Sequence, residues 1–520
     1  MFARLTDDEL RTMQALQELE KLNDPQFEAW LKSCKPVSKL QFIKALAPDL
    51  CKNDIAGETG EIKVSSQKTK IKSVEKNKND APFEETNQQK TKIKPDETKI
   101  NPHKGFLPVG RRMIGSKARQ TIFLPLQDLS KHTVILAGSG SGKTVMVRRL
   151  VEEAALSGTP SLVIDCANDL AMLGDAWPVR PSAWEAQDAA KAQKYHQQAE
   201  VIIWTPGIEK GNPLKLEPLP DMSALKHDAD ELEQAVGMVR DALQVIAAPG
   251  TSQKAQKKRG VLHAALEYSA HQGQNGLTDF IELLADLPPD AGGGITNSEK
   301  LALEMADSLR AQMQTDILLK QHGAALDPAQ LFGIGETSSQ TRISVINFVG
   351  LPALASQQQF LNQLAMTLFT WIKKNPAPPD SPLRGLLVID EAKDFIPSGK
   401  SAPCKDSMLR LAAQARKYGL GLIFATQAPK SIDHNIIANC NTHFYGQANS
   451  PAAIEVVKEQ IRLRGGNGKD VPRLGTGKFY FYSEKTGVPF KIIAPLCLSY
   501  HPPTPPPEEE IIRRACKRKV

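Results

Sequence analysis

KHTVILAGSGSGKT, residues 131–144, is the stretch that decides the fold of this chain. It begins with a short apolar run, 134–137, which has the length and composition of a buried strand. A loop of glycine and serine follows, and then the helical pattern VMVRRLVEEAALSG. A buried strand, a glycine-rich loop and a helix, in that order, predict a phosphate-binding P-loop. A flexible Gly/Ser linker, the alternative interpretation, does not explain the flanking strand and helix.

Each residue type in this loop has a chemical reason to be there. Glycines let successive backbone N–H groups turn toward phosphates without a Cβ in the way. Lys143 can reach the β- and γ-phosphate oxygens of ATP, and the Thr144 hydroxyl can bind Mg²⁺. The strict pattern begins with glycine, but here that position holds Ala137. The residues predicted to hold the nucleotide are Gly138, Ser139, Gly140, Ser141, Gly142, Lys143 and Thr144.

A second apolar run carries two acids at its end. LLVIDE, residues 386–391, predicts a buried strand whose last residues are Asp390 and Glu391. At such a position Asp390 can hold Mg²⁺, and Glu391 can orient or deprotonate the attacking water. Strands that simply end in solvated acids are common, so the pair is informative because a P-loop precedes it. Together the two motifs predict ATP hydrolysis with Mg²⁺.

Two further residues are candidates for this site. Gln427 ends another predicted strand, Leu422–Thr426, and can lie between the γ-phosphate and Glu391; the alternative is an amide that only caps a loop. Arg416 precedes that strand in QARKYG, where it can face a neighbouring subunit. A surface arginine in a basic turn is an equally good interpretation of Arg416.

Length and composition limit the class of protein. The chain has 520 residues, enough for two or more domains, and an ordinary globular composition. No apolar run approaches the length of a membrane span, and the N-terminus does not resemble a signal peptide, so a cytoplasmic protein without an integral membrane segment is expected. Seven scattered cysteines indicate neither a disulfide framework nor a zinc site. The net charge of +7 permits nucleic-acid binding without arguing for it.

Changes in composition divide the chain into segments. Residues 1–51 predict a small helical module, and the lysine-rich segment 52–104 predicts a disordered tether. From 105 to 500, short apolar runs alternate with helical patterns, which predicts an α/β core with a mostly parallel central sheet. Within this core, 206–341 is predicted to be a helical insertion. After the core, 501–520 is predicted to be a proline-rich, charged tail that is exposed or flexible.

The predicted strands of this core are short and apolar on both faces, as parallel strands covered by helices are. A β-hairpin is predicted near the end of the core, and 107–127 is predicted to hold no more than a remnant of β structure. The predicted strands are Val134–Ala137, Leu162–Asp165, Val201–Trp204, Ile343–Phe348, Leu386–Asp390 and Leu422–Thr426, with the hairpin formed by Lys478–Tyr482 and Val488–Ile493.

The motifs together resemble the HerA/FtsK-like branch of P-loop motor ATPases, and HerA-type proteins most closely. The resemblance rests on LSKHTVILAGSGSGKT, LVIDCANDL, LLVIDEAKDFIP and QARKYGLGLIFATQAPKSIDHNIIANCNTHFYGQ, and covers about residues 107–500. It implies a RecA-like core, a hexameric ring and pumping of DNA through a central channel. It also implies that a trans-acting arginine finger falls on Arg416, and that the acid of the second core strand is Asp165.

At its front the sequence departs from this family. HerA-type proteins often begin with a small β-barrel that helps to assemble the ring, whereas residues 1–104 here predict helices and a tether. The module at 1–51 is therefore a candidate docking site for a partner nuclease or effector protein. Inside the predicted insertion, Lys254, Lys257, Lys258 and Arg259 can meet DNA phosphates, although a solvated helix face is the simpler interpretation.

Three functions are compatible with these motifs. The first is an ATP-driven DNA translocase or helicase. The second is a secretion-system ATPase that moves protein substrates, and the third is a nucleotide-dependent scaffold in a defence complex. Glu391 favours hydrolysis over a purely structural use of ATP.

Overall fold

The protein is described from a computed structural model. It describes residues 105–516, except 217, 274, 275, 321, 322, 336, 337, 380 and 382. The chain divides into two units, Met1–Pro102 and His103–Val520, and every described residue belongs to the second. The helical module predicted for 1–51 and the tether predicted for 52–104 lie outside the described residues.

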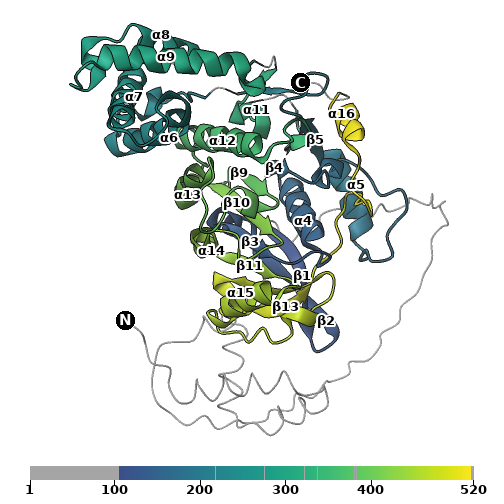
Figure 1. The fold of residues 1–520 in the computed structure, drawn as a ribbon. Helices are drawn as coiled ribbons and strands as arrows, with labels where there is room; N and C mark the ends of the chain where they lie inside the picture. The colour runs from purple at the N-terminus through teal and green to yellow at the C-terminus, as the bar shows by residue number, and fades with distance from the viewer. Residues whose placement is uncertain are drawn as a thin grey trace, which may run out of the picture. The chain divides into compact units, whose positions relative to one another are not determined.

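One large sheet runs through the described unit, and its parallel part confirms the predicted α/β core (Figure 1). The strand that leads into the Gly/Ser loop lies between two parallel neighbours. All the strands predicted for the core are present, shifted by one or two residues at their ends. In spatial order the parallel strands are β11 (Thr442–Tyr445), β3 (Thr133–Leu136), β10 (Leu420–Thr426), β9 (Gly385–Ile389), β4 (Ser161–Asp165), β8 (Thr341–Asn347) and β5 (Ala199–Trp204).

Antiparallel strands extend the sheet beyond β11. The predicted hairpin is confirmed, and a second hairpin adds to it where only a remnant of β structure was expected. The sequence prediction also missed β11, whose four residues are too few to show a period. The antiparallel strands are β12 (Lys478–Ser483), β13 (Phe490–Ile493), β1 (Phe106–Ile114) and β2 (Lys117–Pro125).

The parallel strands are mostly apolar because both faces of the sheet are covered. Along β3, Val134 and Leu136 belong to one hydrophobic core, whereas Ile135 belongs to the other. Successive side chains of a strand point to opposite faces, so a strand between two helical layers needs apolar residues on both of its faces.

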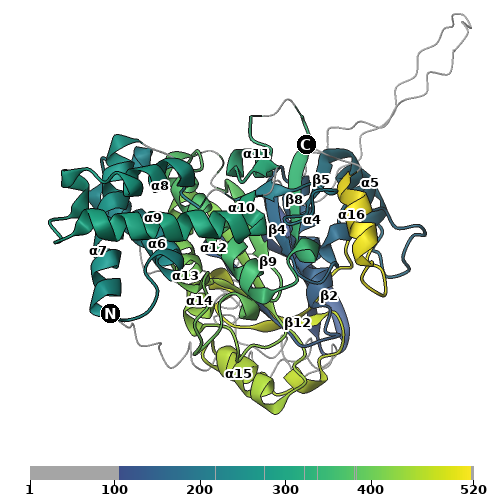
Figure 2. The same ribbon diagram turned by 45° about the horizontal axis from the view of Figure 1, so that its top comes forward.

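Helices form a layer on each face of the sheet (Figures 1 and 2). One layer contains the helix that follows the Gly/Ser loop, and the helices packed against it. These are α4 (Lys143–Leu156), α5 (Asp188–Gln198) and α16 (Glu508–Cys516). The opposite layer contains α12 (Leu354–Lys374), α13 (Lys405–Gln414) and α14 (His434–Asn439), and α15 (Pro451–Arg462) follows β11.

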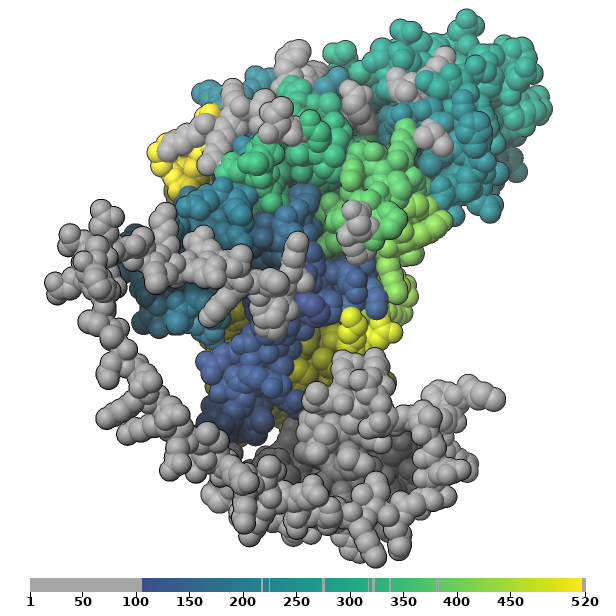
Figure 3. Space-filling model, turned by 180° about the vertical axis from the view of Figure 1, so that it is seen from behind, coloured from purple at the N-terminus to yellow at the C-terminus, as the bar shows by residue number. Residues whose placement is uncertain are grey.

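Between β5 and β8 the chain is mainly helical. Four longer helices pack together and form a lobe at one end of the described unit, as the view from behind shows (Figure 3). Two short strands and two short helices complete this segment. The elements are β6 (Leu214–Lys215), α6 (Ala229–Ala247), α7 (Gln253–Gln272), α8 (Leu277–Ala285), α9 (Ser298–Thr315), α10 (Ile317–Lys320), β7 (Ala324–Ala325) and α11 (Pro328–Phe332).

The tail predicted for 501–520 begins with exposed and half-buried residues, and its described part ends with the helix α16. Ile511 and Ala515 of α16 are buried in the hydrophobic core on the face of the sheet that α4 covers. Before α16, the buried Glu152 carboxylate of α4 accepts hydrogen bonds from the Leu498 and Ser499 backbone N–H groups, at 2.6 and 2.9 Å. Leu498 and Ser499 lie just before the predicted tail, and their contacts depend on an acceptor that is far away in the chain.

No helix among the described residues is both long and apolar enough to cross a membrane.

A buried histidine anchors the amino end of β3. The ring of His132 contacts the Ala412 carbonyl through Nε2, at 2.8 Å, and accepts from the Leu422 N–H through Nδ1, at 3.1 Å. Burial lowers the pKa of His132 to about 4, with the Ala412 contact opposing this and Arg416 adding to it. His132 is thus neutral in the folded protein at neutral pH.

His132 should make stability depend on pH. Below the ordinary histidine pKa of about 6.5, the His132 ring is protonated in the unfolded chain but stays neutral in the folded chain. The free energy of unfolding should therefore fall by about 2 kcal/mol, for this one residue, between about pH 7 and about pH 5. Urea unfolding of the wild type and of His132→Gln at the two pH values measures the difference. Equal pH dependence in the two proteins would contradict the role of His132.

Candidate functional site

The Gly/Ser loop lies at the carboxyl end of β3 and leads directly into α4, as predicted for a P-loop. Gly140 and Gly142 have φ of 75° and 93°, in the left-handed region that favours glycine. A Cβ on Gly142 would also lie 3.1 Å from the Gly477 nitrogen. Ser139 and Gly140 are exposed, so the loop is open to a ligand. Thr144 is the second residue of α4.

Four successive carbonyls of the loop accept hydrogen bonds. Within the loop, the Ser141 hydroxyl donates to the Gly138 carbonyl at 2.6 Å. From outside it, the Asn449 amide donates to the Ser139 carbonyl at 3.2 Å. The Thr476 hydroxyl donates to the Gly140 carbonyl at 2.8 Å, and the Gly477 N–H donates to the Ser141 carbonyl at 2.8 Å.

These donors set the orientation of the loop's peptide units. In a trans peptide the C=O and the following N–H point in opposite directions. With the carbonyls of Ser139 and Ser141 held by outside donors, the N–H groups of Gly140 and Gly142 point the other way and stay available to an anion. We call Asn449, Thr476 and Gly477 the loop clamp. No local sequence pattern indicates this clamp, because its members lie in short loops more than 300 residues after the P-loop.

Lys143 is paired with both predicted acids. Its ammonium forms an ion pair with Asp390 and another with Glu391, the second at 3.1 Å, and the side chains of Lys143 and Asp390 are almost fully buried. Burial alone would lower the pKa of Lys143, but the two carboxylates outweigh it and raise the pKa above its usual value. The structure therefore brings the P-loop and the Asp-Glu pair into one site.

Glu391 has a special backbone and an additional cation. Its φ is 57°, in the left-handed region, which costs a residue with a side chain on the order of 1 kcal/mol. Its carboxylate contacts Lys393 at 3.2 Å and the Gln427 backbone N–H at 3.4 Å. Burial would raise the pKa of Glu391, but Lys143 and then Lys393 outweigh it and lower the pKa. Glu391 is thus held as the carboxylate that a water-orienting base requires.

Gln427 lies beside this site, but it contacts Glu391 through its backbone. Its side chain is exposed. The predicted position between Glu391 and a phosphate therefore stays a prediction about the nucleotide-bound protein.

Asp165 ends β4 next to the strand of Asp390 and is engaged locally. One of its carboxylate oxygens accepts from the Ala171 N–H and from the Asn347 amide, both at 3.0 Å. Burial raises the pKa of Asp165 to about 6, although these donors oppose the shift. Asn347, at the end of β8, was not predicted; it also donates to the side chain of Asn168 at 2.9 Å. These hydrogen bonds hold the turn after β4 at the edge of the site.

Arg416 lies far from its own chain's P-loop. It is exposed, in a short turn at Ala415–Tyr418 that precedes the amino end of β10. β10 runs parallel to β3, and its seven residues span about 20 Å. Arg416 is therefore at the edge of the sheet opposite to Lys143, and its guanidinium does not belong to the site of its own subunit.

The residues fit a magnesium nucleotide better than a metal bound by protein alone. No group of three or more His, Cys, Asp or Glu side chains in the described part of the chain is arranged to hold a metal ion. Mg²⁺ typically takes one or two protein ligands and completes its shell with phosphate oxygens and water. Asp390 and Thr144 are the candidate protein ligands, and the open loop supplies donors for the phosphates.

Comparison with known proteins identifies the family of the chain's larger part. The family described as "Helicase HerA, central domain" matches residues 107–367, half of the 520 residues. The match includes the P-loop and Asp165, and it ends before Asp390.

Two curated relatives match over shorter stretches. Protein P9 of Pseudoalteromonas phage PM2 is 33% identical over 78 residues, 15% of this chain and 34% of P9. The DNA double-strand break repair helicase HerA of Sulfolobus acidocaldarius is 26% identical over 145 residues, 27% of this chain and 29% of that helicase. The chain thus matches about a third of the length of each relative.

Two solved structures show more distant likeness. Plasmid coupling protein TrwB in complex with ADP and Mg²⁺ has a TM-score of 0.47 at 14% identity, covering 78% of this chain and 97% of the TrwB chain. VirB4 of Thermoanaerobacter pseudethanolicus has a TM-score of 0.44 at 13% identity, covering 75% and 96%. Because both scores are low, the fold class rests on the strand order of this chain, and the family on the match to residues 107–367: the chain belongs to the family of the HerA helicase central domain.

Proposed function

We propose that this protein is an ATP-hydrolysing motor that assembles as a hexameric ring and translocates or unwinds DNA. The observation that best supports ATP hydrolysis is the pair of ion pairs that Lys143 forms with Asp390 and Glu391 beside an open P-loop. The membership of the HerA central-domain family supports DNA as the substrate. The ring and its DNA channel follow from the family resemblance.

Binding of ATP changes the partners of Lys143. The γ-phosphate competes with Asp390 and Glu391 for the ammonium, and the two carboxylates are released as Lys143 turns to the phosphates. Asp390 is then free to bind Mg²⁺ together with Thr144. Glu391 is free to orient the attacking water, with Gln427 beside it.

The position of Arg416 supports a site shared between subunits. A guanidinium at the opposite edge of the sheet is unable to reach its own γ-phosphate, but a neighbour in a ring can present it. In that position it would stabilise the charge that develops on the transferred phosphoryl group.

The DNA substrate is tested by measuring ATP hydrolysis with and without DNA. We expect DNA to stimulate hydrolysis. Hydrolysis without stimulation would favour the transport of protein substrates, and nucleotide binding without hydrolysis would favour a scaffold. The proposed docking of a nuclease or effector on residues 1–51 stays a prediction.

The two ends of the ion pair should have separable roles. Lys143→Ala should abolish tight ATP binding, since the β- and γ-phosphates lose their main cation. Glu391→Gln should keep ATP binding but stop turnover, because the amide does not act as a base. Fluorescent ATP-analogue binding and phosphate release measure the two effects. Equal loss of binding in both variants would show that Glu391 is structural.

The loop clamp should affect binding more than turnover. Thr476→Val removes the hydroxyl that holds the Gly140 carbonyl while keeping the shape of the side chain. The dissociation constant for ATP should rise about three- to tenfold, since one hydrogen bond contributes on the order of 1 kcal/mol. The value of kcat at saturating ATP should stay close to that of the wild type. Thr476→Ser, which keeps the hydroxyl, is the control and should bind like the wild type; a valine variant with unchanged affinity would refute the role of the clamp.

Arg416→Ala should bind ATP normally and lose most turnover, because an arginine finger contributes about 10³–10⁵ in rate. Mixing this variant with Lys143→Ala is the decisive experiment. Some interfaces in the mixed rings combine an intact Lys143 with an intact Arg416 from the neighbour, so activity should partly return. If joint rings form, as native mass spectrometry can show, and no activity returns, Arg416 does not act in trans.

A further inference from the structure

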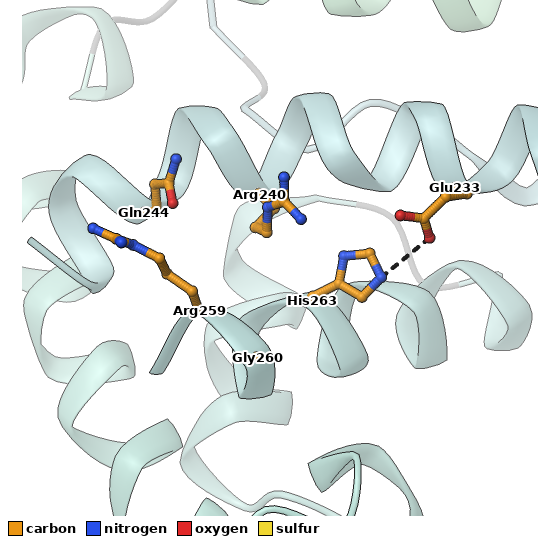
Figure 4. A pocket seen from close by; sticks show the side chains of 6 residues that line it. All are labelled: Glu233, Arg240, Gln244, Arg259, Gly260 and His263. Atoms are coloured by element: carbon orange, nitrogen blue, oxygen red, sulfur yellow. Dashed lines mark ion pairs between the residues drawn. The ribbon is translucent and has the colours of Figure 1, made fainter. Parts of the chain in front are cut away.

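A cavity of about 410 Å³ lies in the helical lobe, between α6 and α7 (Figure 4). It is distinct from the nucleotide site, and no motif predicted it. Two arginines from different helices line it, together with an amide, an imidazole and one exposed acid. The lining residues are Glu233, Arg240 and Gln244 of α6, and Arg259, Gly260 and His263 of α7.

Two buried nitrogen atoms at this cavity lack a hydrogen-bond partner among the described residues. The Arg259 guanidinium donates through one terminal nitrogen to the Gly250 carbonyl, but its buried Nε–H has no acceptor. His263 contacts Glu233 through Nε2 at 3.1 Å, whereas its Nδ1 is buried without a partner. A buried donor without a partner is unfavourable, so a ligand that accepts from the Arg259 Nε–H is favoured.

Near the cavity, the arginine side chains outnumber the carboxylates that pair with them. Arg240 pairs with Asp241 at 2.7 Å, but Asp241 also pairs with Arg410 of α13, at 3.3 Å. One carboxylate therefore serves two guanidinium groups. Glu233, the only acid in the lining, is paired with His263, so no acid of the lining neutralises Arg259.

The lysines of the same helix have a different arrangement. Lys254 and Lys258 both pair with Glu304 of α9, at 2.7 and 3.1 Å. Lys257 is exposed and does not line the cavity. Of the basic cluster identified in the sequence, only Arg259 therefore lines the cavity.

We infer that this cavity binds a phosphate-type oxyanion. Arg259 and Arg240 are planar, charged donors of the kind that match the oxygens of a phosphate. Arg240 and the Gln244 amide each donate to Asp241, which leaves their other N–H groups for an anion. His263 is held by Glu233 through Nε2, and its ring lines the same cavity. The volume leaves room for the sugar next to the phosphate.

Two sources of this anion share the same chemistry. One is a phosphodiester of a polynucleotide, and the other is the phosphate of a free nucleotide or inorganic phosphate. The polynucleotide source rests on the proposed DNA motor, whereas the anion site itself does not.

The test uses the full chain in the Lys143→Ala background, which removes the cation of the P-loop. Inorganic phosphate is titrated by calorimetry into this protein and into versions that also carry Arg259→Gln or Lys257→Gln. Both added substitutions remove one positive charge from α7, but only Arg259 lines the cavity. We expect Arg259→Gln to weaken phosphate binding at least fivefold and Lys257→Gln to leave it unchanged. Equal binding in both, or no binding in the background, would overturn the inference.

A second arm separates the two sources. Fluorescent single- and double-stranded oligonucleotides are titrated into otherwise wild-type protein with each substitution, at fixed salt. If the anion is a phosphodiester, Arg259→Gln should weaken DNA binding at least threefold more than Lys257→Gln and leave hydrolysis without DNA unchanged. If only phosphate binding responds, the occupant is a free phosphate or nucleotide. If phosphate binding depends on Arg259 but DNA neither binds nor stimulates hydrolysis in the wild type, the motor proposal fails and the anion site stands.

Arg240→Gln is the second variant, for the case in which Arg259→Gln unfolds. It removes a donor from the opposite wall while Asp241 keeps Arg410 as a partner. Circular dichroism and hydrolysis without DNA show that each variant is folded. Phosphate binding by folded Arg240→Gln that equals binding by the background protein would contradict the inference.

Discussion

The pairing of Lys143 with Asp390 and Glu391 is the interaction on which the site depends. A buried ammonium without a partner is strongly unfavourable, so the elements that carry the three residues have to stay close together. Lys143 and Asp390 are 247 residues apart in the chain. They meet because β3 and β9, on either side of β10, are parallel strands of one sheet. The carboxyl ends of parallel strands share one edge of the sheet, and this makes a loop and a distant acid pair into one site.

The parts of the fold that the sequence predicts are those with a local cause. Strands covered on both faces are apolar on both, and so 162–164, 386–389 and 422–425 are visible as short apolar runs. The P-loop is visible for a similar reason, because its glycines and Lys143 are required by the geometry of the loop itself. Asp390 and Glu391 are recognisable as site residues because they come directly after one of these apolar runs.

The parts that escape prediction depend on distant partners. Thr476 and Asn449 have ordinary side chains in ordinary loops, and only the folded chain shows that they reach the P-loop carbonyls. β11 is four residues long and is recognised by its pairing with β3. The anion cavity likewise needs α6 and α7 side by side, since neither helix alone gathers Arg240 and Arg259.

The contact of Glu152 with Ser499 has a consequence for synthesis. α4 is made early, yet the acid and the backbone N–H that satisfies it are 347 residues apart. A ribosome adds about 5–20 residues per second, so this buried carboxylate waits many seconds for its partners. The Glu152 carboxylate lacks these two donors until the chain has grown past Ser499. The P-loop helix thus leaves the ribosome long before the segment that completes its contacts, and its final packing is a late step of folding during synthesis.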